Sequence, residues 1–166
     1  MGYASTQTKA YATRQAIENG AQEIDIVLNL GALFGGEYQF VEDEIAAVVD
    51  TAQGRTVKVI LETGYYQDMD RIKTACQIVE AARGKFVKTN LGFAPSPYTN
   101  QFGRTVGYTV EILRLIHNSV SVEVGVKAAQ DVRRLKDALD VIEIGVTRFG
   151  VSRTESLFKE FDQMFS

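Results

Sequence analysis

Helix-like and strand-like segments alternate along this chain of 166 residues, and the alternation limits the fold more than any other feature. Side-chain periods of two, bounded by Gly and Pro, predict five strands over residues 23–30, 56–63, 86–93, 120–128 and 147–150. Periods near 3.6 predict helices over residues 6–19, 40–52, 68–84, 105–116 and 130–143, and a last helix through Leu157, Phe158, Phe161 and Phe165. This order favours an α/β fold with a parallel sheet.

The polar residues of these strands are confined to one face. Parallel strands are ordinarily apolar on both faces, because helices cover both sides of the sheet. Here one face of four strands carries polar pairs, which are Asp25 and Asn29, Lys58 and Glu62, Lys88 and Asn90, and Glu123 and Lys127. A TIM (β/α)8-type barrel explains this pattern, because its inner face lines a pocket at the carboxyl ends of the strands. An open doubly wound sheet is the alternative, although residues 31–36 (GALFGG) lack the spacing of a phosphate-binding loop.

Composition excludes several classes of function. A chain with 45% hydrophobic residues can form one domain over residues 1–166. The net charge of −3 arises from 18 basic and 21 acidic residues without a basic patch, so we expect no nucleic-acid partner. One cysteine, Cys76, and one histidine, His117, predict neither disulfides nor a metal site. No segment resembles a membrane span or a signal peptide, so we expect a soluble cytoplasmic protein.

Lys88 lies in the middle of a short apolar run, FVKTNLGF, at residues 86–93. An ammonium group removed from water is costly, and the usual relief is a lowered pKa, which makes an amine nucleophilic towards carbonyls. The alternative is a lysine whose stem covers apolar surface while its head reaches water at the strand end. The run by itself leaves both interpretations open.

Asp25 and Lys127 share the inner face with Lys88, and the three residues form a possible catalytic set. One amine would attack a carbonyl, a second cation would tune it, and a carboxylate would relay protons. Taken singly, Asp25 is as readily an ion-pair partner of Lys58 or Lys127, and Lys127 is as readily a strand-end lysine in water. The conjunction favours catalysis, because structural ion pairs seldom place two lysines inward on nearby strands.

Five segments resemble the deoxyribose-phosphate aldolase family: EIDIVLNLGAL, VKVILETGYY, FVKTNLGF, VGVKAAQDVR and TRFGVS. The resemblance implies a class I aldolase, a lyase on a TIM barrel without metal or organic cofactor, which reversibly cleaves 2-deoxy-D-ribose 5-phosphate to D-glyceraldehyde 3-phosphate and acetaldehyde. It implies that Lys88 forms the Schiff base, that Lys127 tunes it and that Asp25 relays protons. It also implies substrate-binding roles for Thr89, Asn90, Gly150 and Ser152.

The chain departs from the family pattern at two places in the expected pocket. The family usually reads KTSTG where this chain has Lys88 to Gly92 as KTNLG, so two hydroxyl groups are lost. The family usually has two glycines where this chain has Gln130 and Asp131, which adds a negative charge where a phosphate would bind. We therefore expect altered hydrogen bonding and weak phosphate affinity.

The resemblance also implies that the first three strand-helix units of the family are absent, which leaves about five of eight strands. Such an arc has two exposed edge strands, near residues 23–30 and 147–150, so we expect a homo-oligomer. Two functions remain open. The chain is a Schiff-base aldolase acting on a small phosphorylated sugar or aldehyde, or it is an inactive or altered remnant that acts as an oligomeric binding or structural module.

Overall fold

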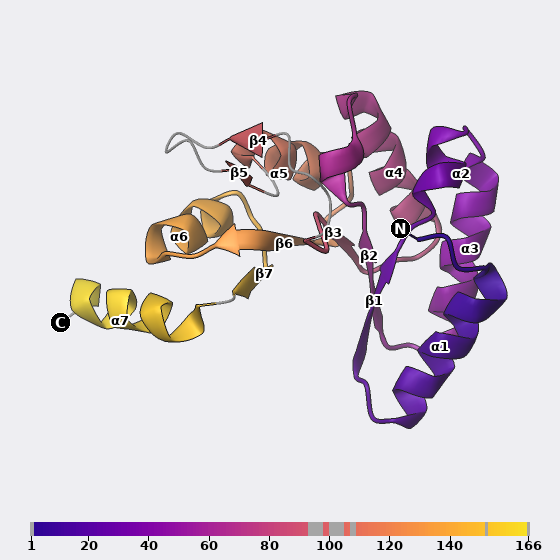
Figure 1. The fold of residues 1–166 in the computed structure, drawn as a ribbon, viewed down its shortest axis with the longest axis horizontal. Coiled ribbons are helices and arrows are strands. Elements are labelled where there is room, and N and C mark those ends of the chain that lie inside the picture. The colour runs from indigo at the N-terminus through magenta and orange to yellow at the C-terminus, as the bar shows by residue number, and fades with distance from the viewer. Residues whose placement is uncertain (1, 93–97, 100–104, 107–108, 152, 166) are drawn as a thin grey trace.

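The computed structural model describes residues 2–92, 98–99, 105–106, 109–151 and 153–165 (Figure 1). The helices are α1 (Thr6–Glu18), α2 (Leu30–Phe34), α3 (Tyr38–Thr51), η1 (Thr63–Tyr65), α4 (Met69–Ala81), α5 (Val110–His117), α6 (Leu135–Glu143) and α7 (Thr154–Phe165). The strands are β1 (Glu23–Val27), β2 (Thr56–Ile60), β3 (Phe86–Lys88), β4 (Tyr98–Thr99), β5 (Thr105–Val106), β6 (Gly125–Val132) and β7 (Arg148–Val151).

Five of the strands form one parallel sheet in the order β1-β2-β3-β6-β7, while β4 and β5 form a small antiparallel pair. An ion pair joins Glu23 on β1 to Arg148 on β7, which are the two outermost strands of the sheet. A flat sheet would hold these strands far apart, so the sheet must curve strongly. The sheet is an arc of a barrel, which confirms the predicted incomplete TIM-barrel fold.

The apolar core lies between the outer face of this sheet and the helices. Val57, Val59 and Val87 project outward from β2 and β3 and are buried. They belong to the same cluster as Ile45 of α3 and Val79 of α4. Figure 1 shows α1, α3 and α4 along one side of β1 and β2, so the opposite, inner face is left for the polar side chains.

The fourth large strand lies further along the chain than the sequence predicts. β6 begins at Gly125 and not at residue 120, and exposed Glu123 lies in the preceding turn, so the prediction that Glu123 is on the inner face was wrong. β6 continues to Val132 because that residue pairs with Val151 of β7. The following helix therefore begins at Leu135 and not at residue 130. Pairing with β7 overrides the local helical pattern.

Other boundaries also differ from the predicted ones. Residues 105–106 are the strand β5, and the helix expected there begins at Val110. β1 ends at Val27, because the side chain of Asn29 caps α2 by accepting a hydrogen bond from Ala32 N at 3.1 Å. β2 ends at Ile60, so Glu62 lies beyond the strand. β3 ends at Lys88 and not at residue 93, so Asn90 also lies beyond its strand. Asn29, Glu62 and Asn90 are therefore not inner-face strand positions. None of the described helices is long and apolar enough to span a bilayer.

Candidate active site

Four neighbouring strands place charged side chains on the inner face of the arc. Asp25 of β1 is in register with Lys58 of β2, and Lys88 of β3 is in register with Lys127 of β6. Inward positions on adjacent parallel strands lie about 5 Å apart, which is within reach of one carboxylate for long lysine side chains. The strand pairing therefore brings three amines to Asp25.

The carboxylate of Asp25 accepts a hydrogen bond from each of the three amines. Oδ2 accepts from Lys88 Nζ at 2.8 Å and from Lys127 Nζ at 3.0 Å. Oδ1 accepts from Lys58 Nζ at 2.9 Å. Because Lys88 and Lys127 share one oxygen, their amines are close neighbours. The structure thus brings together all three residues that the sequence suggests as catalytic.

The three amines differ in their access to solvent. The side chain of Lys58 is 4% exposed, that of Lys88 is 11% exposed and that of Lys127 is 21% exposed. Lys58 also donates to Glu23 Oε2 at 2.8 Å, so two carboxylates hold its amine. The side chain of Lys88 is thus mostly sheltered from water but keeps a small exposed part. A nucleophilic amine needs such an environment if a small molecule is to reach it.

The electrostatics of Asp25 follow from these contacts. Partial burial raises its pKa, but the hydrogen bonds from Lys88, Lys58 and Lys127 together hold the pKa well below the usual range. Asp25 is therefore ionised at neutral pH and supplies a negative charge shared by three cations. This charge keeps the amines together in a partly dry site.

Below the lysines, towards the amino ends of the strands, a second group of side chains fills the arc. The guanidinium carbon of Arg148 lies 4.7 Å from the centre of the Phe86 ring, a cation–π contact. A Cβ atom at Gly125 would lie 2.4 Å from Cε1 of Phe86, so glycine is needed there to make room for the ring. Glu23 pairs with Arg148 across the arc. These residues form a floor under the lysine cluster.

Hydrogen bonds from Arg148 and Lys58 lower the pKa of Glu23 to about 2. Because this value lies below the ordinary 4.5, ionised Glu23 stabilises the fold fully above about pH 4.5, and this stabilisation is lost as the pH falls towards 2. We expect the free energy of unfolding to fall less steeply over this range in Glu23→Gln than in the wild type. Urea unfolding at several pH values measures it. Glu155→Gln, at an exposed pair on α7, is the control, and equal slopes in wild type and Glu23→Gln would contradict the prediction.

The predicted substrate-binding residues have different environments. Thr89 is wholly buried, and its hydroxyl donates to Ala129 O at 3.2 Å and accepts from Ala129 N at 3.0 Å. Asn90 is also buried, and its Oδ1 accepts from the hydroxyl of Thr63 at 3.1 Å. Gly150 is half-buried on β7, and Ser152 lies outside the described residues. These contacts do not support a substrate contact by Thr89, and all four roles stay predictions. The side chains of Gln130 and Asp131 also lie outside the described part.

Sequence reasoning assigns Lys58 only as an alternative ion-pair partner of Asp25, yet the structure makes it the third amine of the cluster. The parity that places Lys58 inward was the available signal. The floor residues Glu23 and Arg148 carried no such signal, because they are 125 positions apart in the sequence. Within the described residues, no group of three or more His, Cys, Asp and Glu side chains could hold a metal ion.

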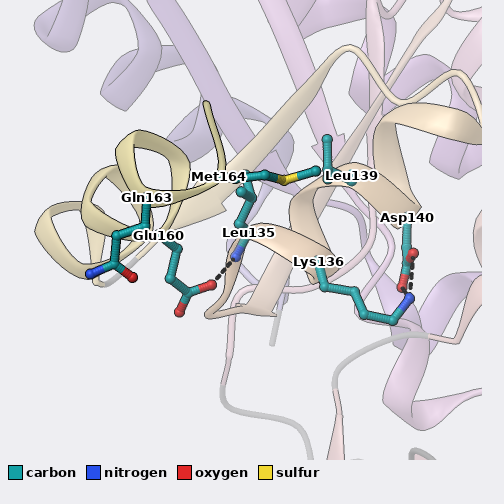
Figure 2. A pocket seen from close by; sticks show the side chains of 7 residues that line it. All are labelled: Leu135, Lys136, Leu139, Asp140, Glu160, Gln163 and Met164. Carbon is teal, nitrogen blue, oxygen red and sulfur yellow. Dashed lines mark hydrogen bonds and ion pairs between the residues drawn. The ribbon is translucent and has the colours of Figure 1, made fainter. Parts of the chain in front are cut away.

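A separate pocket of about 560 Å³ lies between α6 and α7 (Figure 2). Leu135, Leu139 and Met164 form its apolar part. Its charged groups already have partners, because Glu160 accepts from Leu135 N at 2.8 Å and Lys136 donates to Asp140 at 2.9 Å. The residues that line it do not include the lysine cluster or Asp25.

An arc of parallel strands with polar side chains on its inner face is the architecture of (β/α)8-barrel enzymes. Solved structures of aldolases share this architecture. "QR15, an Aldolase" matches with a TM-score of 0.86 and 35% identity, over 99% of this chain and 69% of that one. A putative deoxyribose-phosphate aldolase from Coccidioides immitis matches with a TM-score of 0.86 and 29% identity, over 97% of this chain and 60% of that one.

Relatives found by sequence identify the family more narrowly than the solved structures do. Deoxyribose-phosphate aldolase from Streptococcus uberis is 46% identical over 152 residues, which is 92% of this chain and 64% of the relative. The one from Streptococcus equi subsp. zooepidemicus is 42% identical over 159 residues, 96% of this chain and 67% of the relative. The chain belongs to the deoxyribose-phosphate aldolase family, and it spans about two thirds of the length of these relatives. No protein-family model matches it.

Proposed function

We propose that this chain acts as a class I aldolase, in which Lys88 forms a Schiff base with an aldehyde. The main observation in support is that two amines bind the same carboxylate oxygen. Lys88 Nζ lies 2.8 Å from Asp25 Oδ2, and Lys127 Nζ lies 3.0 Å from it. The family relationship supports the reversible cleavage of 2-deoxy-D-ribose 5-phosphate to D-glyceraldehyde 3-phosphate and acetaldehyde as the reaction. A small phosphorylated sugar is thus the proposed substrate, and the weak phosphate affinity expected from Gln130 and Asp131 stays a prediction.

The proposed cleavage begins when the neutral amine of Lys88 attacks the C1 carbonyl and water leaves, which forms a protonated imine. A base removes the proton of the C3 hydroxyl, the C2–C3 bond breaks, and its electron pair flows into the imine to give an enamine. The three carbons from C3 to C5 leave as glyceraldehyde 3-phosphate. Protonation of the enamine at C2 and hydrolysis of the imine release two-carbon acetaldehyde and free Lys88.

Asp25 and Lys127 have complementary roles in this scheme. Lys127 places a positive charge next to the attacking amine of Lys88, on the same oxygen of Asp25, and tunes its reactivity. Asp25 is ionised and bound to both amines, so it can pass a proton between them and a water molecule on the open side of the cluster. Lys58 stays bound between Asp25 and Glu23 and stabilises the carboxylates.

Trapping with borohydride in the presence of acetaldehyde tests the proposal. Reduction of the imine would leave one ethyl group on the peptide that contains Lys88, detected by mass spectrometry, and Lys88→Arg should remain unmodified. An adduct on Lys127 or Lys58, with Lys88 unmodified, would reverse the assignment. A folded chain without any adduct would favour the alternative of an inactive binding or structural module.

We also propose that the chain assembles with itself. β1 and β7 are the edges of the described sheet, and Leu139, Ile142, Phe158, Phe161 and Met164 of α6 and α7 are exposed. Unpaired strand edges and apolar helix faces are usual sites of association. Light scattering coupled to gel filtration at micromolar concentration should give at least twice the mass of one chain. A monomer with a cooperative thermal transition would contradict this expectation.

A further inference from the structure

Glu62 combines two unfavourable features directly beside the reactive strand. Its side chain is wholly buried, and its backbone is left-handed, with φ 55° and ψ 59°. A buried carboxyl group is costly unless hydrogen-bonded, and a left-handed conformation is strained for a residue other than glycine. Such strain persists where the surrounding structure imposes it, often near a functional site.

The side chain of Glu62 binds the segment that follows Lys88. Both of its oxygens accept from the backbone N–H of Leu91, with Oε1 at 3.2 Å and Oε2 at 3.1 Å from the nitrogen. The regular pairing of β2 with β3 ends at the pair Ile60 and Lys88. Beyond that pair, the left-handed turn at Glu62 directs its side chain across to Leu91.

The neighbours of Glu62 bind the intervening residues in order. Leu61 N donates to Lys88 O at 2.9 Å, and Thr63 N donates to Thr89 O at 3.1 Å. The hydroxyl of Thr63 donates to Asn90 Oδ1 at 3.1 Å. Residues 61–63 thus contact each residue from 88 to 91.

The same segment is held from its other side by β6. Thr89 N donates to Lys127 O at 3.2 Å, and the Thr89 hydroxyl binds the backbone of Ala129. The backbone that carries Lys88 is therefore fixed between Glu62 and Thr63 on one side and the strand of Lys127 on the other. The position of the Lys88 amine relative to Asp25 and Lys127 depends on this support.

We propose that Glu62, assisted by Thr63, is a positioning residue that holds the segment after Lys88 so that its amine stays at Asp25 and Lys127. This inference rests on the proposed Schiff-base function. It makes the carboxyl group of Glu62 a determinant of the rate of imine formation, although Glu62 touches none of the reacting atoms.

The test measures borohydride trapping at Lys88 against acetaldehyde concentration, together with hydrogen exchange of the Leu91 amide. In Glu62→Ala we expect the maximal trapping rate to fall at least about tenfold, because a misplaced reactive group costs rate more than affinity. The half-saturating concentration should stay the same, and the Leu91 amide should exchange faster. Glu62→Gln keeps one acceptor oxygen and should retain trapping to within about threefold, which is a rescue by the conservative variant.

Glu44→Gln is the matched control. Glu44 is also wholly buried, but its partner is Lys9 of α1 and not the segment that follows Lys88. This variant should lower the melting temperature without changing the trapping rate of the folded chain. If Glu62→Ala does not fold, Thr63→Val replaces it, since this change removes only the hydroxyl that binds Asn90.

The outcomes separate the two proposals. Wild-type trapping kinetics in folded Glu62→Ala, or in Thr63→Val when that variant is needed, would overturn the positioning role and leave the proposed function intact. Slow trapping in Glu62→Gln equal to that in Glu62→Ala would also overturn it, because the acceptor oxygen would then not matter. A wild-type chain without an adduct at Lys88 would overturn the proposed function, and the positioning role with it.

Discussion

Asp25→Asn should lower the rate of aldehyde trapping at Lys88 by about 100-fold or more, the usual scale for loss of a general acid–base group. Asparagine keeps one acceptor oxygen but replaces the other with an NH₂ group, which would face an ammonium instead of accepting from it. Lys88, Lys127 and Lys58 would then lose the negative charge that they share. The measurement is the rate of adduct formation with acetaldehyde and borohydride at neutral pH.

The same change should also destabilise the fold. Removing one partner from a fully buried ion pair costs roughly 3–5 kcal/mol, and the cost here should be lower, about 1–3 kcal/mol, because the side chain of Asp25 is 28% exposed. Asp50→Asn is the matched control, since Asp50 pairs with Arg83 on the exposed surface. The control should change neither quantity. Trapping in Asp25→Asn as fast as in the wild type would limit Asp25 to a structural role.

Lys127→Leu should slow trapping at Lys88 by about tenfold at neutral pH, less than the roughly 100-fold that a 1 Å misplacement of a reactive group can cost. The reason is that Lys127 places a second positive charge next to the Lys88 amine, and both amines bind the same oxygen of Asp25, so removing Lys127 changes the surroundings of that amine. Leucine removes the charge and keeps much of the apolar stem. The measurement is the rate of adduct formation with acetaldehyde and borohydride at neutral pH.

Lys136→Leu provides the control for this prediction, because Lys136 lies on α6 and binds Asp140. Its trapping rate should match that of the wild type. An unchanged rate in Lys127→Leu would mean that Lys127 does not tune the amine and is better described as a surface lysine or one that faces the substrate phosphate. Circular dichroism checks that both variants keep the fold.

Parity along each strand was enough to predict the centre of the site. Asp25, Lys58, Lys88 and Lys127 all lie on the inner face, because the two-residue period of a strand is a local property that needs no knowledge of its neighbours. The same reasoning failed for four positions. Asn29 uses its side chain to cap α2, and Glu62, Asn90 and Glu123 lie outside β2, β3 and β6.

Strand ends depend on long-range pairing, which local patterns do not contain. β6 extends to Val132 because β7 pairs with it there, although residues 130–132 fit a helical pattern in isolation. The contact between Glu62 and Leu91 spans 29 positions and needs a left-handed turn that nothing in the local sequence signals. Neither feature was predictable from one strand at a time.

The sequence alone therefore determined the alternation of elements and which face of each strand would be polar, because both follow from the periodicity of neighbouring side chains. The tertiary structure alone decided which of these side chains meet. Three lysines converge on Asp25, and Glu23 reaches Arg148 across the arc, because strands distant in the chain pair in a particular register and the sheet then curves. Register and curvature are set by the packing of the whole sheet against its helices.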